Sequence, residues 1–450
     1  MNKRNLKFIK VLILLQTFKR YTYTMAAKTK VLIFAFILTY GATNSFEVKK
    51  IEGVNGNVEN VLFDSKFNKF VFCSVYGNED LEILYKLDPE NNVIFVKELV
   101  DVDCVMYLND KDELYLICGQ SPGLTGDISV IRANSTEVEK ILSFDNFLSI
   151  FQDNTGNLMY NGFNPGLLFL KYNTTIPVTV KNLENFLRIY DPFATDENGD
   201  TYVAGYEFDP ETGDVVENQF VVIPGDTKEE APEGFVIQGV LDDPMKDLIE
   251  SVSITSNNEI IIGIINEELM PSVKKLVNGT VIAIYGNEGY DKYSIFAGKR
   301  TIIVEYDYEH GMSRITSLGD DGEKVEILNS RNDTWAIEYK DVSIDEEGNA
   351  FISWLSAEEQ ISQLAFLDYK NTMAVDVDLE DINTIFGLVF DGNNNLWINT
   401  DSRTYFIENG GLEGQKVPDS KHFAGMWVNR VKKSNEVYLS TGNEFYVISN

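Results

Sequence analysis

Short runs of alternating apolar and polar residues occur in pairs along most of this chain, and a polar turn separates the two runs of each pair. In residues 340–356, KDVSIDEEGNAFISWLS, Val342 and Ile344 alternate with polar residues before the turn, and Ile352 and Trp354 do so after it. Alternating runs joined by a turn rich in Asp, Asn and Gly are a strong β-hairpin signal. The pattern therefore predicts an antiparallel hairpin in this segment.

The same hairpin pattern recurs at a spacing of about forty to fifty residues. Two further extended runs follow most copies, for example residues 81–88 and 92–99 after the first copy. Four antiparallel strands per repeat at this period are typical of β-propeller blades. We therefore predict an all-β fold, a single β-propeller of eight or nine four-stranded antiparallel blades. The copies begin at Val61, Met106, Ser149, Phe193, Ile254, Lys340, Leu388 and Val431, and a further hairpin turn is expected at Phe296.

The last repeat supplies only three strands before the chain ends. Its missing fourth strand is expected in FEVKKIEG, residues 46–53. Pairing of this strand with the C-terminal blade closes the ring and removes exposed sheet edges. We therefore assign residues 46–450 to one propeller domain.

The longest interval between two hairpins contains two polar insertions rich in Pro and Gly. They are DPETGDVVEN, residues 209–218, and PGDTKEEAPEG, residues 224–234. Such composition is typical of surface loops. We therefore expect both insertions to lie on the surface.

Residues 1–45 have the pattern of a secretory signal peptide. Basic residues precede the apolar run 31–40, and small polar residues follow it up to Ser45. Neither this run nor the run at 11–15 reaches the roughly 18–20 apolar residues that span a bilayer. We expect cleavage after Ser45 and a secreted, extracellular, soluble protein; Met25 is an alternative initiator to Met1.

Four glycosylation sequons are consistent with export and predict a glycoprotein. They lie at Asn134, Asn173, Asn278 and Asn332.

The charge of the chain argues against polyanionic partners. The net charge is −32, and the first 45 residues hold eight basic residues and no acid. The remainder therefore carries 30 Lys or Arg against 70 Asp or Glu, a net charge of about −40. Because such a field repels nucleic acid and anionic membranes, we expect neither as a partner. The acidity favours solubility, with cation binding as the alternative.

The three cysteines all lie in the first two repeats. A hairpin turn centred on Lys111 places Cys104 directly opposite Cys118, close enough for a disulfide. Cys73 occupies the position of Cys118 one repeat earlier, at a sheet-packing distance of roughly 10 Å. We predict a Cys104–Cys118 disulfide with Cys73 free and buried; three buried free thiols are the alternative.

Motifs for catalysis and for cofactors are absent from the sequence. We find no nucleophile elbow, phosphate loop, dinucleotide fingerprint or zinc signature, and only His310 and His422 are available as histidines. The acidic turns lack the spacing of a calcium loop, and their Asp, Asn and Gly are what the turn itself requires. We therefore predict no catalytic residue, no metal and no cofactor.

Ligands of propellers usually meet the ring near its axis, where each innermost strand enters. The positions five and four residues before each hairpin turn are predicted to lie there. They combine acids, lysines and aromatic residues, a set suited to a planar, partly charged small molecule; a solvated channel is the alternative. The candidates are Glu59, Asp191, Glu250, Asp291, Lys292, Lys340, Asp341, Phe386 and Trp427.

The chain resembles the secreted insect haemolymph propellers typified by ommochrome-binding protein. The resemblance lies in the leader, in NVENVLFDSKFNKFVFCSVYGN followed by LEILYKLD, and in hairpins such as FATDENGDTYVAGYE. It is more distantly similar to royal-jelly/yellow and gluconolactonase-like propellers. The resemblance implies a carrier that binds an aromatic metabolite or pigment without catalysis. We expect the protein to be a monomer.

Two alternatives to a carrier follow from the same residues. The acids Glu59, Asp191, Glu250 and Asp291 suit a metal-dependent, gluconolactonase-like hydrolase. The outer faces of the blades suit a secreted protein-interaction or storage propeller.

Overall fold

The computed structural model of the chain describes most of residues 46–449. The described part omits residues 76–77, 101–102, 110, 120–125, 145–146, 163–165, 188–192, 210, 213, 230, 256, 267–270, 287–291, 298–299, 308–311, 319–323, 330–336, 346, 357–361, 370–374, 378, 380–381, 419, 421–422, 429–433, 435 and 442–443. The predicted leader (residues 1–45) and the sequon at Asn332 therefore lie outside the described residues.

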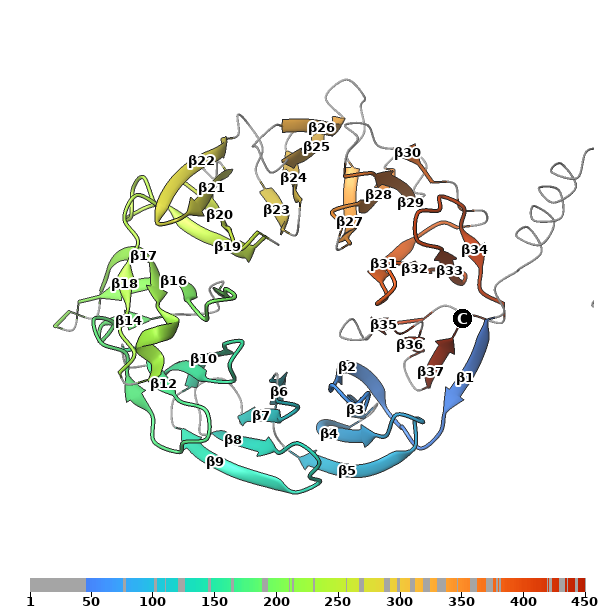
Figure 1. The fold of residues 1–450 in the computed structure, drawn as a ribbon, viewed down its shortest axis with the longest axis horizontal. Coiled ribbons are helices and arrows are strands. Elements are labelled where there is room, and N and C mark those ends of the chain that lie inside the picture. Colours follow the sequence, from blue (N-terminus) through green and yellow to red (C-terminus); the bar gives the residue numbers. More distant parts are fainter. Residues whose placement is uncertain are drawn as a thin grey trace, which may run out of the picture. The chain divides into compact units, whose positions relative to one another are not determined.

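The fold is an all-β propeller of nine blades, as predicted, within the compact unit Val48–Ser449. In Figure 1 the sheets follow one another around a ring, with first strands such as β2, β6, β19, β27 and β31 innermost. Blade 1 contains β2(Asn57–Phe63), β3(Lys69–Val75), β4(Asn78–Leu87) and β5(Val93–Val100), and blade 2 contains β6(Asp103–Leu108), β7(Leu114–Gly119), β8(Gly126–Ile131) and β9(Val138–Phe144). Blade 3 contains β10(Phe147–Gln152), β11(Leu158–Gly162), β12(Leu168–Leu170) and β13(Val178–Thr179). Blade 4 has five strands, β14(Phe186–Leu187), β15(Phe193–Thr195), β16(Thr201–Phe208), β17(Val215–Ile223) and β18(Phe235–Val236).

Blades 5 to 8 continue the same order of strands. Blade 5 contains β19(Leu248–Ile254), β20(Ile260–Ile265), β21(Pro271–Val277) and β22(Thr280–Gly286), and blade 6 contains β23(Lys292–Ala297), β24(Thr301–Asp307), β25(Met312–Leu318) and β26(Lys324–Asn329). Blade 7 contains β27(Ile337–Ile344), β28(Ala350–Ser356), β29(Ser362–Leu367) and β30(Val375–Asp376). Blade 8 contains β31(Ile385–Phe390), β32(Leu396–Thr400), β33(Thr404–Ile407) and β34(Gln415–Lys416).

Blade 9 joins the two ends of the propeller. Its strands are β35(Gly425–Val428), β36(Glu436–Ser440) and β37(Phe445–Ser449), and β1(Glu47–Ile51) completes the sheet beside β37. Lys50 of β1 also forms an ion pair of 3.0 Å with Glu444. The predicted closure of the ring by the N-terminal strand is therefore confirmed.

The hydrophobic core lies between the blades. In β3 of blade 1, Phe70 and Phe72 pack against side chains of blade 2, whereas Val71 and Cys73 pack against Tyr438 of blade 9. Because successive side chains of a strand point to opposite faces, one apolar strand joins both neighbouring blades. This two-sided burial explains why the second strands of the blades read as continuous apolar runs.

The turn between the first and second strand of a blade, the inner turn, has one repeated geometry. In blade 7 the Asp345 carboxylate accepts hydrogen bonds from the backbone N–H (2.8 Å) and side-chain amide (2.8 Å) of Asn349. The fourth residue of the turn has a positive φ, which favours Gly, Asn and Asp. The residues in this position are Phe67, Asp112, Gly156, Gly199, Asn258, Gly348 and Asn394. The acidic turns are therefore held by their own hydrogen bonds.

The direction of the strands distinguishes two end faces of the propeller, which we name the turn face and the entry face. The inner turns, at residues 64–68, 109–113, 153–157, 196–200, 255–259, 345–349 and 391–395, define the turn face. Because the strands of a blade are antiparallel, the third-to-fourth strand turns also lie at this end. The opposite end, where the chain enters each first strand, is the entry face.

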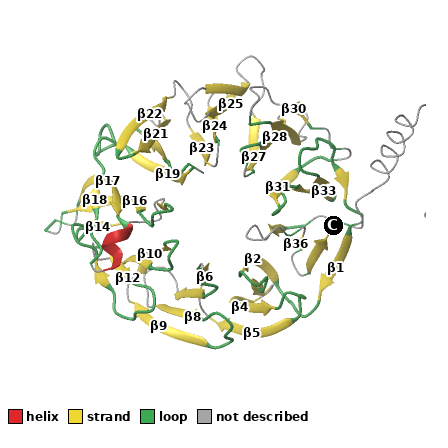
Figure 2. Cartoon of the chain, viewed as in Figure 1, coloured by secondary structure: helices red, strands yellow, loops and turns green. Residues whose placement is uncertain are grey.

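The second insertion in blade 4 reaches the surface at Asp226 and Ala231, as predicted, but it forms a short helix where a loop was expected. Among the described residues the one helix is the 3-10 helix η2(Gly225–Glu229), drawn red in Figure 2. It buries Lys228, whose Nζ contacts Asp153 Oδ2 of blade 3 at 2.9 Å and Thr201 Oγ1 at 2.7 Å. The first insertion is shorter than predicted because β17 already begins at Val215. The insertion carrying η2 thus connects two blades.

The structure contains a disulfide between Cys104 and Cys118, which face each other in the register of β6 and β7. Cys73 is free and buried in β3.

No helix in the described residues has the length and hydrophobicity needed to cross a membrane.

Candidate functional site

Within the described residues, a β-bulge interrupts the innermost strand of five blades close to the entry face. At each bulge, one residue has no partner on the second strand, so its side chain leaves the regular alternation of the sheet. All five bulged residues lie five residues before the inner turn. They are Glu59, Leu148, Glu250, Lys340 and Phe386.

Three bulged residues with described side chains are exposed. The Phe386 side chain is 54% exposed although it belongs to an innermost strand, and Glu59 and Glu250 are exposed as well. Glu59 Oε1 accepts hydrogen bonds of 2.7 Å from Asn57 Nδ2 and from Ser74 Oγ. The bulges thus place one aromatic ring and two carboxylates at equivalent positions of blades 8, 1 and 5.

The candidate Trp427 does not lie at a bulge. Trp427 is partly buried and packs against the core between blades 9 and 1, with its ring edge-on to Phe445 at 6.4 Å between centroids. Its strand β35 has no bulge, and Trp427 pairs with Tyr438. A regular pairing directs the side chain to a face of the sheet instead of the axis. Trp427 is therefore a core residue, contrary to the expectation of an axial position.

Five candidates have no described side chain. Lys292 lies at the start of β23 beside Tyr306, and Lys340 and Asp341 lie in β27, where Lys340 occupies the bulge. Asp191 and Asp291 lie outside the described residues.

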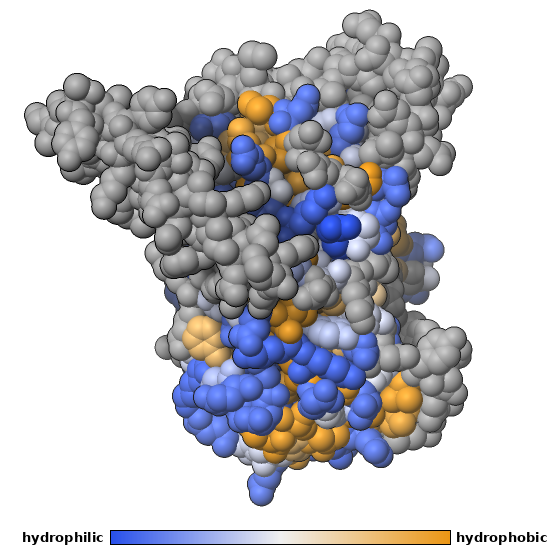
Figure 3. Space-filling view, turned by 90° about the vertical axis from the view of Figure 1, so that its right-hand side faces the viewer, coloured by the Kyte–Doolittle hydropathy of each residue, from blue (hydrophilic) through white to orange (hydrophobic). Residues whose placement is uncertain are grey.

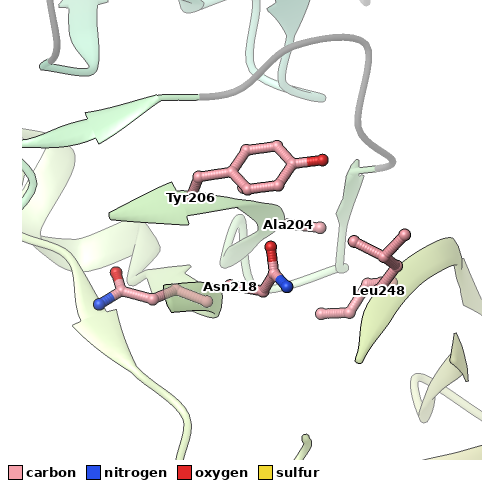
Figure 4. Close-up of a pocket in the computed structure, with 7 residues that line it drawn as sticks. Ala204, Tyr206, Asn218 and Leu248 are labelled. Atoms are coloured by element: carbon pink, nitrogen blue, oxygen red, sulfur yellow. The ribbon is translucent and has the colours of Figure 1, made fainter. Parts of the chain in front are cut away.

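Blade 4 contains a small pocket that the sequence pattern did not indicate. Its innermost strand is divided into β14 and β15, and neither part pairs with Ala204 or Gly205 of β16. The pocket lies between β16, β17 and β19, and its cavity volume is about 10 Å³. Figure 4 shows Tyr206, Asn218 and Leu248 around it. Its volume is below the 300–1,000 Å³ typical of drug-sized ligands, so it does not accommodate a pigment.

Asn218 is fixed at the edge of this pocket. Its side-chain Nδ2 donates a hydrogen bond of 2.8 Å to the carbonyl of Asp247, and its backbone N–H donates one of 2.7 Å to the carbonyl of Pro244. The wide spacing between the hairpins of blades 4 and 5 was the one sequence signal for an irregularity here.

The described residues hold no cluster of three or more His, Cys, Asp or Glu side chains placed to bind a metal ion.

Burial raises the pKa of the Cys73 thiol to about 12, and the negative charge of nearby Glu59 makes a smaller contribution in the same direction. Cys73 is therefore a protonated core residue at neutral pH.

Exposed apolar residues also occur on the outer strands of the blades. Ile94 and Val96 of β5 and Phe235 of β18 are 49%, 51% and 45% exposed. Figure 3 shows one side of the molecule, where hydrophobic residues are grouped at the lower end among hydrophilic ones. Val105 of β6 and Leu248 of β19 are exposed on innermost strands as well, so Phe386 is distinguished by being an aromatic residue at a bulge of an innermost strand.

The fold and the bulged innermost strands define a β-propeller, and comparison with solved structures agrees. The chain is similar to dipeptidyl peptidase 4 of Porphyromonas gingivalis (9% identity, TM-score 0.53, covering 83% of this chain and 60% of the peptidase). It is also similar to a streptogramin B lyase (10% identity, TM-score 0.38, covering 78% of this chain and 94% of the lyase). A third similar structure is an oligogalacturonate lyase of Vibrio parahaemolyticus (10% identity, TM-score 0.41, covering 88% of this chain and 98% of the lyase).

The similarity to dipeptidyl peptidase 4 supports the fold and shows no specific family. The chain spans 52% to 60% of the length of four peptidases that it matches. No protein-family model matches the sequence. No curated protein matches it either.

Proposed function

We propose that the protein is a secreted, soluble, monomeric carrier that holds a small aromatic metabolite or pigment at the entry end of the propeller axis. The observation that carries the proposal is Phe386, whose ring is 54% exposed at a bulge of an innermost strand. An exposed aromatic ring is a flat apolar surface on which a planar ligand stacks, worth about 0.5–1.5 kcal/mol beyond area burial.

The carboxylates at equivalent bulges specify the charge of the ligand. Glu59 and Glu250 are exposed on the innermost strands of blades 1 and 5. A carboxylate attracts a cationic group and repels an anionic one, most strongly where water is partly excluded. The set favours a planar aromatic molecule bearing an amine. A tryptophan-derived pigment precursor, the ligand class implied by the resemblance to insect haemolymph propellers, has this chemistry.

The proposed export rests on features of the sequence. A leader-like segment occupies residues 1–45, and the chain carries four sequons. Binding by this carrier involves no catalysis and no cofactor.

Purification of the protein from its native fluid tests the proposal. We expect an absorption band in the near-ultraviolet or visible range and a co-purifying aromatic compound in the mass spectrum. Kynurenine, a tryptophan-derived aromatic amine, should quench the intrinsic fluorescence of the ligand-free protein. A colourless protein without a co-purifying compound, whose fluorescence does not respond to kynurenine, would contradict the proposal.

A further inference from the structure

Three of the four sequons occupy the same position in three different blades. Asn134 lies in the turn between β8 and β9 of blade 2, Asn173 in that between β12 and β13 of blade 3, and Asn278 in that between β21 and β22 of blade 5. Each is therefore in a third-to-fourth strand turn. Because strands alternate in direction, these turns lie at the turn face.

Contacts of the described side chains agree with this placement. Lys66, in the inner turn of blade 1, donates a hydrogen bond from Nζ to Asn134 Oδ1. Lys111, in the inner turn of blade 2, lies over the ring of Tyr172 with Nζ 3.4 Å from the centroid. Two sequons thus lie directly beside the inner turns of the preceding blade.

The three asparagines share exposure and backbone conformation. Asn134, Asn173 and Asn278 are exposed, with φ of 62°, 62° and 48°. The hydroxyl residues of the three sequons, Thr136, Thr175 and Thr280, are exposed as well. A glycosylating enzyme needs access to both ends of the sequon, and all three turns provide it.

The hydrogen bonds of these asparagines leave the reacting atom accessible. Asn173 Oδ1 accepts a hydrogen bond of 2.7 Å from Arg132 Nη1, and Asn134 also uses Oδ1 for its contact with Lys66. A glycan is attached through Nδ2, so both contacts are compatible with the modified side chain.

We propose that Asn134, Asn173 and Asn278 carry N-linked glycans that cover the turn face. A lipid-linked oligosaccharide diphosphate is the donor. The bond from the sugar C1 to the diphosphate breaks, the Nδ2–C1 bond forms, and the Nδ2 proton leaves with the lipid diphosphate. The inference rests on the export included in the proposed function.

The experiment uses the full chain expressed in insect cells, with medium and cell lysate analysed separately. Peptide-N-glycosidase should increase the gel mobility of secreted protein and convert Asn134, Asn173 and Asn278 to Asp. Thr136→Ala, Thr175→Ala and Thr280→Ala should each remove one glycan. These exposed threonines are replaced instead of the asparagines because the substitution keeps each Asn in its left-handed turn with its hydrogen bonds.

The outcomes separate this inference from the proposed function. Secreted protein without glycans at these three residues would overturn the inference and leave the carrier proposal intact. Unglycosylated protein confined to the cytosol would overturn both the export and the inference. Glycans at all three residues on a protein that binds no aromatic ligand would support the inference and count against the carrier alone.

Discussion

Asp112, in the inner turn of blade 2, accepts two hydrogen bonds from Ser65, in the inner turn of blade 1. One comes from the backbone N–H at 2.6 Å and the other from the hydroxyl group. Asp112 is also the left-handed residue of its turn, with φ of 62°. Asn258 makes the equivalent contact from blade 5 to the N–H of Glu197 in blade 4, at 3.1 Å. The residue that closes a turn therefore also connects adjacent blades at the turn face.

Replacing Asp112 separates these two roles. Asp112→Ala removes the acceptor and keeps a Cβ in the left-handed region, and we expect it to lower the free energy of unfolding by about 1–2 kcal/mol. Asp112→Gly removes the acceptor but suits the left-handed backbone, so its effect should be smaller by about 1 kcal/mol. Urea unfolding of both variants measures the difference. Unchanged stability of Asp112→Ala would show that the contact contributes nothing.

The buried ion pair between Lys228 and Asp153 predicts a second effect on stability. Lys228→Met leaves the Asp153 carboxylate buried without its cation, which should cost about 3 kcal/mol. Lys97→Met, at an exposed lysine of β5, is the matched control and should change stability by less than about 0.5 kcal/mol. Similar unfolding midpoints for the two variants would contradict the connecting role of η2.

The same pair predicts a dependence on pH. Burial acts to raise the pKa of Asp153, but Lys228 and hydrogen bonds from Asn157 and Thr155 outweigh it, so the pKa is lowered. Burial lowers the pKa of Lys228. As the pH falls, the unfolded chain binds a proton at Asp153 before the folded chain does. The contribution of the pair is therefore present above the ordinary carboxylate pKa and is lost below it. Unfolding midpoints between neutral and acid pH should fall less steeply in Lys228→Met than in the wild type.

The three cysteines should react in a fixed order with iodoacetamide. The native protein should take up no label, because Cys73 is buried with a raised pKa and the other two form a disulfide. Denaturation without reduction should expose Cys73 alone, and reduction should then expose Cys104 and Cys118. Intact mass after each step counts the adducts. More than one adduct before reduction would disprove the disulfide.

A glycan introduced on the entry face should interfere with ligand binding. Ser402 is exposed in the turn between β32 and β33, and Ile385 at the start of β31 pairs with Thr400 beside it. Ser402→Asn creates the sequon Asn-Arg-Thr. Because Thr404 is buried in the folded protein, the glycan must be added before blade 8 folds, and it should then weaken kynurenine binding. Ser402→Gln is the matched control without a glycan. Equal affinities in the two secreted variants would contradict a ligand site near Phe386 at the entry face.

Sequence pattern alone was sufficient for the architecture because each hairpin combines two independent signals. Alternating side chains bury both faces of the strands, and an inner turn such as residues 345–349 needs an acceptor at its start and a left-handed residue in its fourth position. The lone N-terminal strand was predictable because the last repeat lacks one strand. These features are local and repeat along the chain.

The axial residues were only partly predictable because a bulge is not visible in hydrophobic alternation. Five residues before the turn, Glu59 and Phe386 lie at bulges and are exposed, whereas the same count in the regular strand β35 leads to Trp427 in the core. The contact of Lys228 with Asp153 joins residues of different blades, and no local signal marks it. Tertiary packing decides both features.

The most direct test of an axial site for an aromatic ligand compares two phenylalanine variants. Phe386→Ala alters an exposed ring on an innermost strand, and Phe235→Ala alters an almost equally exposed ring, 45% against 54%, on the outermost strand of blade 4. Titration of each with kynurenine, followed by fluorescence, gives the dissociation constants. We predict that Phe386→Ala weakens binding by roughly tenfold, about 1.4 kcal/mol, and that Phe235→Ala leaves it unchanged. Equal affinities for both variants and the wild type would contradict the axial site.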